Sequence, residues 1–287
     1  MNRRSLFLCA LLGVALVHAK GVETDVNGVG SFNTSAPTSA DIANWDTGWG
    51  ESGITGWDYI GADGPASGVY LGNDWVLTAA HVGAGDFTLD GTTYDVVPGS
   101  THGFINTSGT VDLTLFQVAQ GPDLPAITLE TATPTRLSSH HAGDQVAMIG
   151  YGGGTLAWGV NTVTCVNVPV QVAVYSSTFN SIDYETAYGT VTDGTYSATN
   201  NAVLIPGDSG GGDFIYDSST GTWMLAGINE AVDGNNDSYM VQVSTYASQI
   251  NTITGATSVP EPGSFALAGV ALAELLGLRR KCKARSR

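Results

Sequence analysis

Five consecutive residues combine a hydroxyl nucleophile with a backbone that a substrate can approach closely. They are Gly207-Asp208-Ser209-Gly210-Gly211. Acyl transfer needs an exposed nucleophile and backbone N–H groups aimed at the developing oxyanion, and glycines admit a substrate close to the main chain. The segment therefore predicts a serine nucleophile at Ser209 with an oxyanion site built from neighbouring amides.

His81 is the candidate general base. It follows the apolar run Leu77-Thr78-Ala79-Ala80, where an expected strand gives way to a tight turn. A histidine within reach of a serine can take its proton during nucleophilic attack. The other histidines of the body, His102, His140 and His141, do not end such a segment, so His81 is favoured on position.

Asp112 is the candidate carboxylate partner of the imidazole. It directly precedes the apolar residues Leu113-Thr114-Leu115-Phe116, a position suited to a buried carboxylate that fixes the histidine tautomer. Alternative carboxylates stand at Asp86, Asp90 and Asp95. The joint order His, Asp, Ser along the chain favours Asp112.

Chain order also excludes a second kind of serine hydrolase. The residues around Ser209 fit G-x-S-x-G, the nucleophile elbow of α/β-hydrolases, in which the triad histidine follows the serine. The last histidine in this chain is His141, so no base follows Ser209.

Three segments together resemble the signatures of chymotrypsin-like serine peptidases: Thr78–His81, Asp112–Leu115 and Gly207–Gly211. The resemblance extends over about residues 54–254. It implies an all-β fold of two antiparallel six-stranded β-barrels and a short C-terminal helix. His81 and Asp112 would belong to the first barrel and Ser209 to the second. It further implies that His81 activates Ser209, that Asp112 orients the imidazole, and that the amides of Gly207 and Ser209 form the oxyanion hole, with no cofactor or metal.

The same resemblance places the pocket for the P1 side chain of a substrate. Its floor falls at Val203 and its wall at Glu230-Ala231-Val232. An apolar floor cannot pair with Lys or Arg, so we expect cleavage after small or aliphatic residues.

The activation device stays open on the sequence. In zymogen-forming members a new N-terminus pairs with the Asp before the nucleophile, here Asp208. The nearest analogue of the cleavage site is Ile54-Thr55-Gly56-Trp57. Arg136 either pairs with Asp208 instead or lies at the surface.

The elements that must position these residues are short runs rich in Val, Ile, Leu, Thr and Tyr, separated by Gly, Asn, Asp and Pro. Such spacing is typical of a barrel or a sandwich. One helix is expected, at Ser244–Ile253. The predicted strands include Gly68–Leu71, Trp75–Ala79, Thr93–Val97, Leu113–Val118, Gln145–Ile149, Thr162–Tyr175, Asp213–Tyr216, Trp223–Ile228 and Tyr239–Val243.

Both ends of the chain have targeting patterns. Residues 1–19 read as a signal peptide, residues 20–53 as a loose leader or edge extension, and residues 54–256 as the peptidase domain. Residues 257–287 join Val259-Pro260-Glu261-Pro262 to an apolar stretch and a basic end, and resemble PEP-CTERM sorting signals. That resemblance implies export, transient membrane association and an exosortase partner. The alternative is an amphipathic terminal helix.

Charge and cysteine content exclude other classes. Eight of the ten Lys and Arg residues lie in the two ends, leaving Lys20 and Arg136 against 26 acids in the whole chain. So acidic a body repels phosphate, which excludes nucleic acid as a partner. Cys165 is alone in the body, so no disulfide forms within it. Asp233–Asp237 resembles the start of a Ca²⁺ loop but lacks the distal Glu and is also an ordinary turn composition.

A secreted serine endopeptidase acting on protein or peptide substrates is therefore the leading hypothesis. The first alternative is a catalytically silent, surface-displayed binding module on the same fold. A structural protein of the extracellular matrix is a third possibility, which leaves the three catalytic candidates unexplained.

Overall fold

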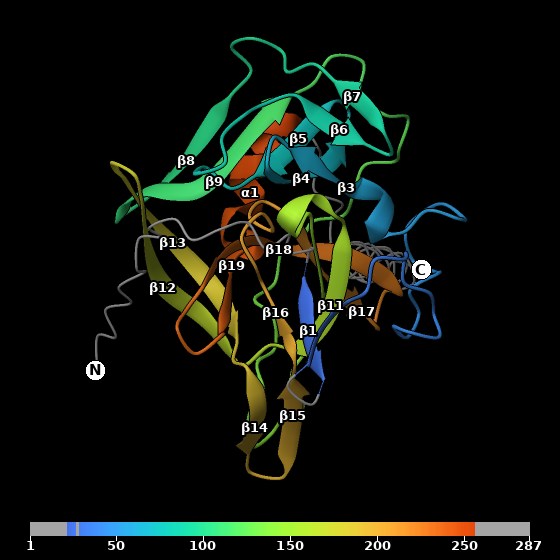
Figure 1. Cartoon of the computed structure of the whole chain (residues 1–287), viewed down its shortest axis with the longest axis vertical. Coiled ribbons are helices and arrows are strands. Elements are labelled where there is room, and N and C mark those ends of the chain that lie inside the picture. The colour runs from blue at the N-terminus through green and yellow to red at the C-terminus, as the bar shows by residue number, and fades with distance from the viewer. Residues whose placement is uncertain (1–21, 27–28, 256–287) are drawn as a thin grey trace, which may run out of the picture. The chain divides into compact units, whose positions relative to one another are not determined.

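The computed structural model describes residues 22–26 and 29–255, so the predicted signal peptide and sorting tail lie outside the described residues. The chain divides into two compact units, residues 1–247 and 248–287. Among described residues the second unit holds only the last turns of helix α1 (Val243–Thr254). Two seven-stranded antiparallel sheets dominate the first unit (Figure 1). The predicted all-β class with a short C-terminal helix is confirmed.

The first sheet carries the His81 and Asp112 segments and has the strand order β7-β6-β3-β4-β5-β9-β8. Its β4–β5 hairpin closes through Asn73 and Asp74, whose positive φ angles of 52° and 66° suit a two-residue type I′ turn. Apolar side chains of β4, β5 and β9 fill its interior. A 3-10 helix, η1 (Gly56–Tyr59), precedes β3 (Ile60–Asp63), β4 (Ala66–Gly72), β5 (Trp75–Thr78), β6 (Phe87–Leu89), β7 (Thr92–Tyr94), β8 (His102–Asn106) and β9 (Gly109–Gln117).

The second sheet surrounds the Ser209 segment and has the order β11-β10-β17-β18-β19-β13-β12. Val146, Met148, Tyr184 and Ala226 lie in its core. Its strands are β10 (Gln145–Gly150), β11 (Ala157–Thr162), β12 (Cys165–Val174), β13 (Ser177–Thr186), β17 (Gly212–Asp217), β18 (Thr222–Val232) and β19 (Ser238–Gln242), with the short 3-10 helix η2 (Gly152–Gly154) after β10.

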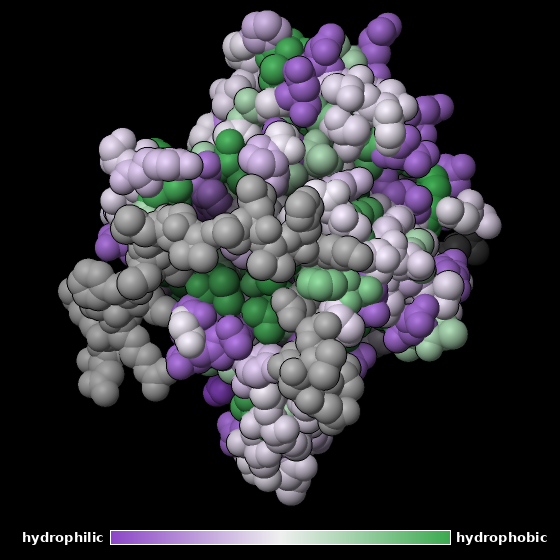
Figure 2. All heavy atoms as spheres, in the orientation of Figure 1, coloured by the Kyte–Doolittle hydropathy of each residue, from purple (hydrophilic) through white to green (hydrophobic). Residues whose placement is uncertain are grey.

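A separate hairpin, β14 (Gly189–Asp193) with β15 (Tyr196–Asn200), projects below the second sheet in Figure 1. Figure 2 colours it mostly pale, as its Thr- and Ser-rich sequence leads one to expect. Two facing hydroxyl pairs bond across the hairpin, Thr190 with Thr199 and Thr192 with Ser197.

Each large sheet has seven strands where six were expected, and its outermost strands do not pair with each other within the described residues. The sheets therefore curve like barrels but do not close by hydrogen bonds. No helix of the described residues is long and apolar enough to cross a membrane. The apolar stretch expected to associate with a membrane, residues 265–278, lies outside the described residues.

The segment expected as a leader or edge extension packs into the fold. Strand β1 (Glu23–Val26) pairs with β2 (Val29–Phe32) on one side and with β16 (Ala202–Val203) on the other. Val22 is fully buried in the core of the second sheet. These contacts tie the start of the chain to the strand that leads into Ser209.

Two tryptophans fasten the rest of this segment to the second sheet. Trp45 is fully buried and meets Trp223 of β18 edge-on at 4.9 Å between ring centroids. Trp49 stacks on the same ring at 5.4 Å and lies edge-on to Phe214 of β17. Buried aromatic rings of this size contribute strongly to stability, so residues 33–53 form a structural layer on β17 and β18.

Candidate active site

His81 and Asp112 are joined by two hydrogen bonds. His81 follows β5 by three residues, and Asp112 lies in β9, the strand paired with β5. The imidazole Nδ1 of His81 is 2.6 Å from Oδ2 of Asp112, and the His81 backbone N–H donates to Oδ1 at 2.8 Å. Asp112 is fully buried and the His81 side chain is 15% exposed. Both carboxylate oxygens thus hold His81, which fixes Nδ1 as the protonated nitrogen and leaves Nε2 free to accept a proton.

The alternative candidates lie elsewhere. His140 and His141 are exposed at a turn, and His102 is exposed beside the Trp75 ring. Asp86, Asp90 and Asp95 are exposed as well. Of all these residues, only His81 and Asp112 form a His–carboxylate contact in the described part of the chain.

The nucleophile segment is a sharp loop between β16 and β17. Gly207 and Gly210 adopt φ angles of 103° and 83°, a region that side chains rarely tolerate. A Cβ on Gly210 would collide with the Ser67 carbonyl oxygen and with Oγ1 of Thr78. Since Thr78 ends β5, this close approach sets the half-buried Ser209 against the strand end that leads to His81.

Some amides of this loop have an acceptor within the protein and others have none. The Asp208 N–H donates to the Ile205 carbonyl at 3.0 Å and is therefore occupied. Within the described residues, the N–H groups of Gly207 and Ser209 have no acceptor. Two unoccupied amides flanking an occupied one match the donor pair that an oxyanion site requires.

Ser67 of β4 clamps the loop from the first sheet, and the sequence did not single it out. Its N–H donates to the Ser209 carbonyl at 2.9 Å and its hydroxyl to the Gly207 carbonyl at 2.9 Å. The same Oγ accepts the Tyr151 N–H at 2.8 Å, and the Ser67 carbonyl accepts the Thr78 hydroxyl at 2.7 Å. Ser67 is fully buried, so these bonds are shielded from water.

Asn229 of β18 holds the other side of the loop, and it too was missed. Its carbonyl accepts the Gly210 N–H and its N–H donates to the Gly211 carbonyl, both at 2.9 Å. Its side-chain amide donates to the Ile149 carbonyl at 3.0 Å. A buried Ser or Asn within a strand has no local sequence signature, so only the fold reveals these two roles.

Asp208 takes its partners from the backbone. The N–H of Gly152 donates to Oδ1 and that of Ile205 to Oδ2, each at 2.8 Å. Full burial raises the pKa of Asp208 to about 7, although both N–H bonds oppose the rise. Arg136 is exposed, and its guanidinium donates to the Leu137 carbonyl. Arg136 was expected either to pair with Asp208 or to lie at the surface, and it lies at the surface.

The Ile54 segment is engaged in a local cap. Thr55, the next residue, donates its N–H and its hydroxyl to the Asp58 carboxylate at 2.7 and 3.1 Å, which closes the start of η1. The carboxylate of Asp208 accordingly has two backbone donors in this structure and none from the Ile54 segment.

Of the four residues expected to line the P1 pocket, three are apolar and pack among the strands, and the fourth, Glu230, has a buried carboxyl group. Val203 is half-buried in β16 and pairs with Glu23, while Val232 packs against the core of the second sheet. Ala231 packs near Tyr239. Glu230 is the extra residue of a β-bulge between Asn229 and Ala231. Its side chain is buried and accepts the Ser181 hydroxyl at 2.9 Å, so it faces the interior behind Asp112.

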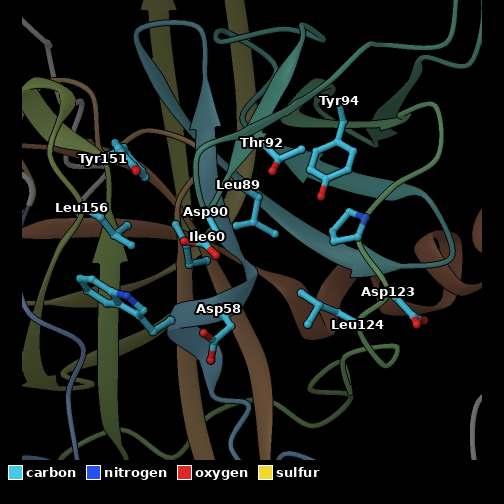
Figure 3. A pocket seen from close by; sticks show the side chains of 12 residues that line it. Asp58, Ile60, Leu89, Asp90, Thr92, Tyr94, Asp123, Leu124, Tyr151 and Leu156 are labelled. Carbon is cyan, nitrogen blue, oxygen red and sulfur yellow. The ribbon is translucent and has the colours of Figure 1, made fainter.

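A pocket of about 510 Å³ lies between the two sheets, and Figure 3 shows its lining. Tyr151 and Leu156 of the second sheet's side face Leu89 and Tyr94 of the β6–β7 hairpin (Figure 3). None of His81, Asp112 and Ser209 lines it. Tyr151 links this pocket to the candidate active site, because its backbone N–H donates to Oγ of Ser67.

The segment considered as a Ca²⁺ loop is a self-bonded turn between β18 and β19. Oδ1 of Asp233 accepts the N–H groups of Asn235 and Asp237 at 2.8 and 3.0 Å. Asp237 in turn accepts the Tyr188 N–H. The ordinary turn reading therefore accounts for these residues.

Two curved antiparallel sheets, a His–Asp pair after β5 and a Gly-Asp-Ser-Gly-Gly loop clamped to the same sheet fit a serine-type peptidase, a hydrolase. The chain belongs to the trypsin family, whose model matches residues 54–254. Residues 258–281 match the PEP-CTERM protein-sorting motif, which indicates export and sorting to the cell surface. No curated protein matches the chain.

Several solved protease structures are similar to the chain at low identity. The Rv3671c protease from M. tuberculosis in its active form is 18% identical, with a TM-score of 0.46, over 69% of this chain and 80% of that one. The NS6 protease from murine norovirus 1 is 15% identical, with a TM-score of 0.43, over 69% and 97%. The HtrA-type protease AlgW with a decapeptide is 20% identical, with a TM-score of 0.43, over 67% and 52%.

Proposed function

We propose that this chain is an exported serine endopeptidase with His81, Asp112 and Ser209 as its catalytic triad. The observation that carries the proposal is the doubly bonded His81–Asp112 pair beside a nucleophile loop that Ser67 clamps to the same sheet. The family match supports the reaction class and the loop geometry supports the roles.

In the proposed reaction, Nε2 of His81 takes the Ser209 proton as Oγ attacks the peptide carbonyl. Asp112 holds the imidazole by Nδ1 and stabilises the imidazolium that forms. The N–H groups of Gly207 and Ser209 bind the oxyanion of the tetrahedral intermediate. His81 then protonates the leaving amine, and water, activated in the same way, releases the acyl-enzyme.

For the substrate, we propose cleavage after small or aliphatic P1 residues. Val203 and Val232 are apolar, and Ala231 between Glu230 and Val232 is small. Glu230, the one acidic residue expected at this pocket, is buried against Ser181 and supplies no charge to it. A pocket without a carboxylate gives Lys and Arg no partner.

We further propose that residues 1–19 are removed on export, and that an exosortase removes the tail after its apolar stretch has held the protein transiently at the inner membrane. The domain boundaries we propose are residues 20–53 for the packed N-terminal segment and 54–256 for the peptidase. The matched sorting motif supports the tail assignment.

Labelling with a fluorophosphonate tests the triad. The folded protein with intact Ser209 should form a covalent adduct, and Ser209→Ala should form none. Ser219→Ala, a change in an exposed turn, is the matched control and should label like the parent protein. A folded parent protein that fails to label would favour the binding module over the enzyme.

A further inference from the structure

A second group of buried acids lies directly behind Asp112. Ser181 of β13 accepts the Asp112 backbone N–H through its Oγ at 3.1 Å and donates its hydroxyl proton to Oε1 of Glu230 at 2.9 Å. Asp183 is two residues further along β13, so its side chain leaves the strand on the same face as Ser181. Asp183 is fully buried and Glu230 is 4% exposed.

The remaining carboxyl oxygens have no donor from any other group. Within the described part of the chain, no N–H or O–H group donates to either carboxyl oxygen of Asp183 or to Oε2 of Glu230. The two carboxyls are near enough that each contributes to the pKa shift of the other, and Ser181 lies beside both of them, bonded to Glu230 and two residues from Asp183. Two ionised carboxylates buried close together with no donor would repel each other, whereas a proton on one of them lets it donate to the other.

No cation offsets these acids. Arg136 is the only Lys or Arg among the described residues, and it is exposed and bonded to a carbonyl. The titratable groups that face the pair are Asp112 from β9, Tyr184 from β13 and Tyr246 from α1. Along these contacts the next basic side chain is that of His81, which Asp112 already binds. Buried charges without a partner are costly, and such groups become neutral instead.

We propose that Glu230 and Asp183 form a proton-sharing carboxyl pair that positions Asp112 through Ser181. The inference rests on the proposed triad and makes Glu230 a positioning residue rather than a pocket residue. The β-bulge explains why Glu230 can take this role. As the extra residue of the bulge, Glu230 turns its side chain inward, whereas a regular strand would point it away from the interior.

Burial raises the pKa values of both carboxyls, which favours the protonated form that a shared proton needs. Desolvation raises the pKa of Asp183 to about 7, and it raises the pKa of Glu230 well above its usual range, with the Asp183 charge adding to the rise. Near neutral pH the pair keeps its shared proton. At higher pH it loses that proton, two like charges repel behind Asp112, and the Ser181 bond that holds the Asp112 backbone is disturbed.

Matched variants separate a neutral acid from a charged one. The carboxamide of Glu230→Gln reproduces a protonated acid, since its oxygen accepts from Ser181 and its NH₂ donates to Asp183. We expect its kcat at about pH 6 to stay within about threefold of the parent, while Glu230→Ala loses about 10- to 100-fold in kcat with little change in KM. Glu130→Gln, at another buried glutamate, is the control and should leave the profile unchanged.

The double variant Glu230→Gln/Asp183→Asn removes the titrating pair. Its kcat should hold at alkaline pH where the parent declines, measured from about pH 5 to about pH 9. Glu230→Gln as impaired as Glu230→Ala, or a double variant whose profile superimposes on the parent's, would overturn the proposal.

Infrared difference spectroscopy tests the pair without relying on activity. Because other buried acids such as Asp208 also hold protons near neutral pH, the band is read as a difference between two proteins. The parent-minus-double-variant spectrum at neutral pH should show the carbonyl-stretch band of a protonated carboxylic acid. Absence of that band from the difference spectrum of the two folded proteins refutes the shared proton. If the band is present but Ser209 does not label with fluorophosphonate, the proposed peptidase function fails while the carboxyl pair stands.

Discussion

The carboxylate of Asp112 binds His81 at two points, the imidazole Nδ1 and the backbone N–H, at 2.6 and 2.8 Å. A carboxylate bonded only to the ring would leave the imidazole free to swing about its side-chain torsions. The second bond ties the carboxylate to the main chain of the same residue, so the position of the ring and the tight turn after β5 are set together.

Replacing this carboxylate tests both bonds at once. Asp112→Asn keeps the shape but its NH₂ group cannot accept a hydrogen bond, so either the ring or the backbone contact is lost and the wrong imidazole tautomer is favoured. We expect kcat to fall by about 10⁴-fold near neutral pH with a small change in KM. Steady-state kinetics on a peptide substrate measures this, with Asp95→Asn, an exposed position directly after β7, as control. A loss below about tenfold would contradict the assignment of Asp112.

Ser67→Ala tests the clamp between the two sheets. Without the hydroxyl, the Gly207 carbonyl and the Tyr151 N–H each lose a buried partner, and the oxyanion amides lose their fixed orientation. We expect kcat to fall by about 10- to 100-fold and the free energy of unfolding by about 1–3 kcal/mol.

The control for that variant is Ser100→Ala. Ser100 is also buried in the first sheet's region and also makes two backbone bonds, to Val97 and Gln117. It should lose similar stability while keeping kcat. Equal losses of kcat in both variants would mean that Ser67 acts only through stability.

The buried acids predict an unusual dependence of stability on pH. Burial raises the pKa values of Asp63, Asp183 and Asp208 to about 7. A raised folded-state pKa means that the folded protein binds protons more tightly than the unfolded chain, so this stability is fully present below the unfolded pKa of about 4 and is lost as pH rises through about 7.

Thermal unfolding at about pH 5 and about pH 8 checks this sign: the midpoint should be lower at the higher pH. Asp63→Asn should reduce the difference, because that carboxyl then no longer titrates. Asp41 is an exposed group, and its hydrogen bonds with Thr38 lower its pKa. Asp41→Asn should therefore not reduce the difference between the two midpoints. A midpoint that rises with pH would show that these acids are charged in the folded state.

Removing residues 22–53 should inactivate the protein rather than activate it. A variant that begins at Ile54 loses buried Val22, Trp45 and Trp49, and each large apolar deletion costs about 2–5 kcal/mol. We expect a lower unfolding midpoint and little fluorophosphonate labelling. A variant that begins at Val22 is the control and should label fully. Stronger labelling of the Ile54 variant would instead indicate a zymogen activated at that site.

The residues with a local signature could be predicted from sequence, and those without one could not. Ser209 stands among glycines that its sharp loop needs, and His81 and Asp112 flank apolar strands, so their types and order point to the site. Ser67 and Asn229 are polar residues within strands. Their partners lie far away in sequence, and only the packing of one sheet on the other brings them together.

The same limit explains the difference at Glu230. An alignment by spacing puts this residue on the pocket wall, but a β-bulge shifts the strand by one residue and turns the side chain inward. The N-terminal segment is a parallel case. Its sparse apolar residues are typical of a loose leader or an edge extension, and those few include Trp45 and Trp49, which pack against aromatic rings of β17 and β18.

The pairing of β1 with β16 also sets when the enzyme can assemble. Glu23 and Val203 face each other across these strands although about 180 residues separate them in sequence. At a synthesis rate of about 5–20 residues per second, the first strand waits on the order of ten seconds or more for its partner. The strand that leads into Ser209 thus becomes ordered only when nearly the whole domain has been made, which delays proteolytic competence until the chain is close to complete.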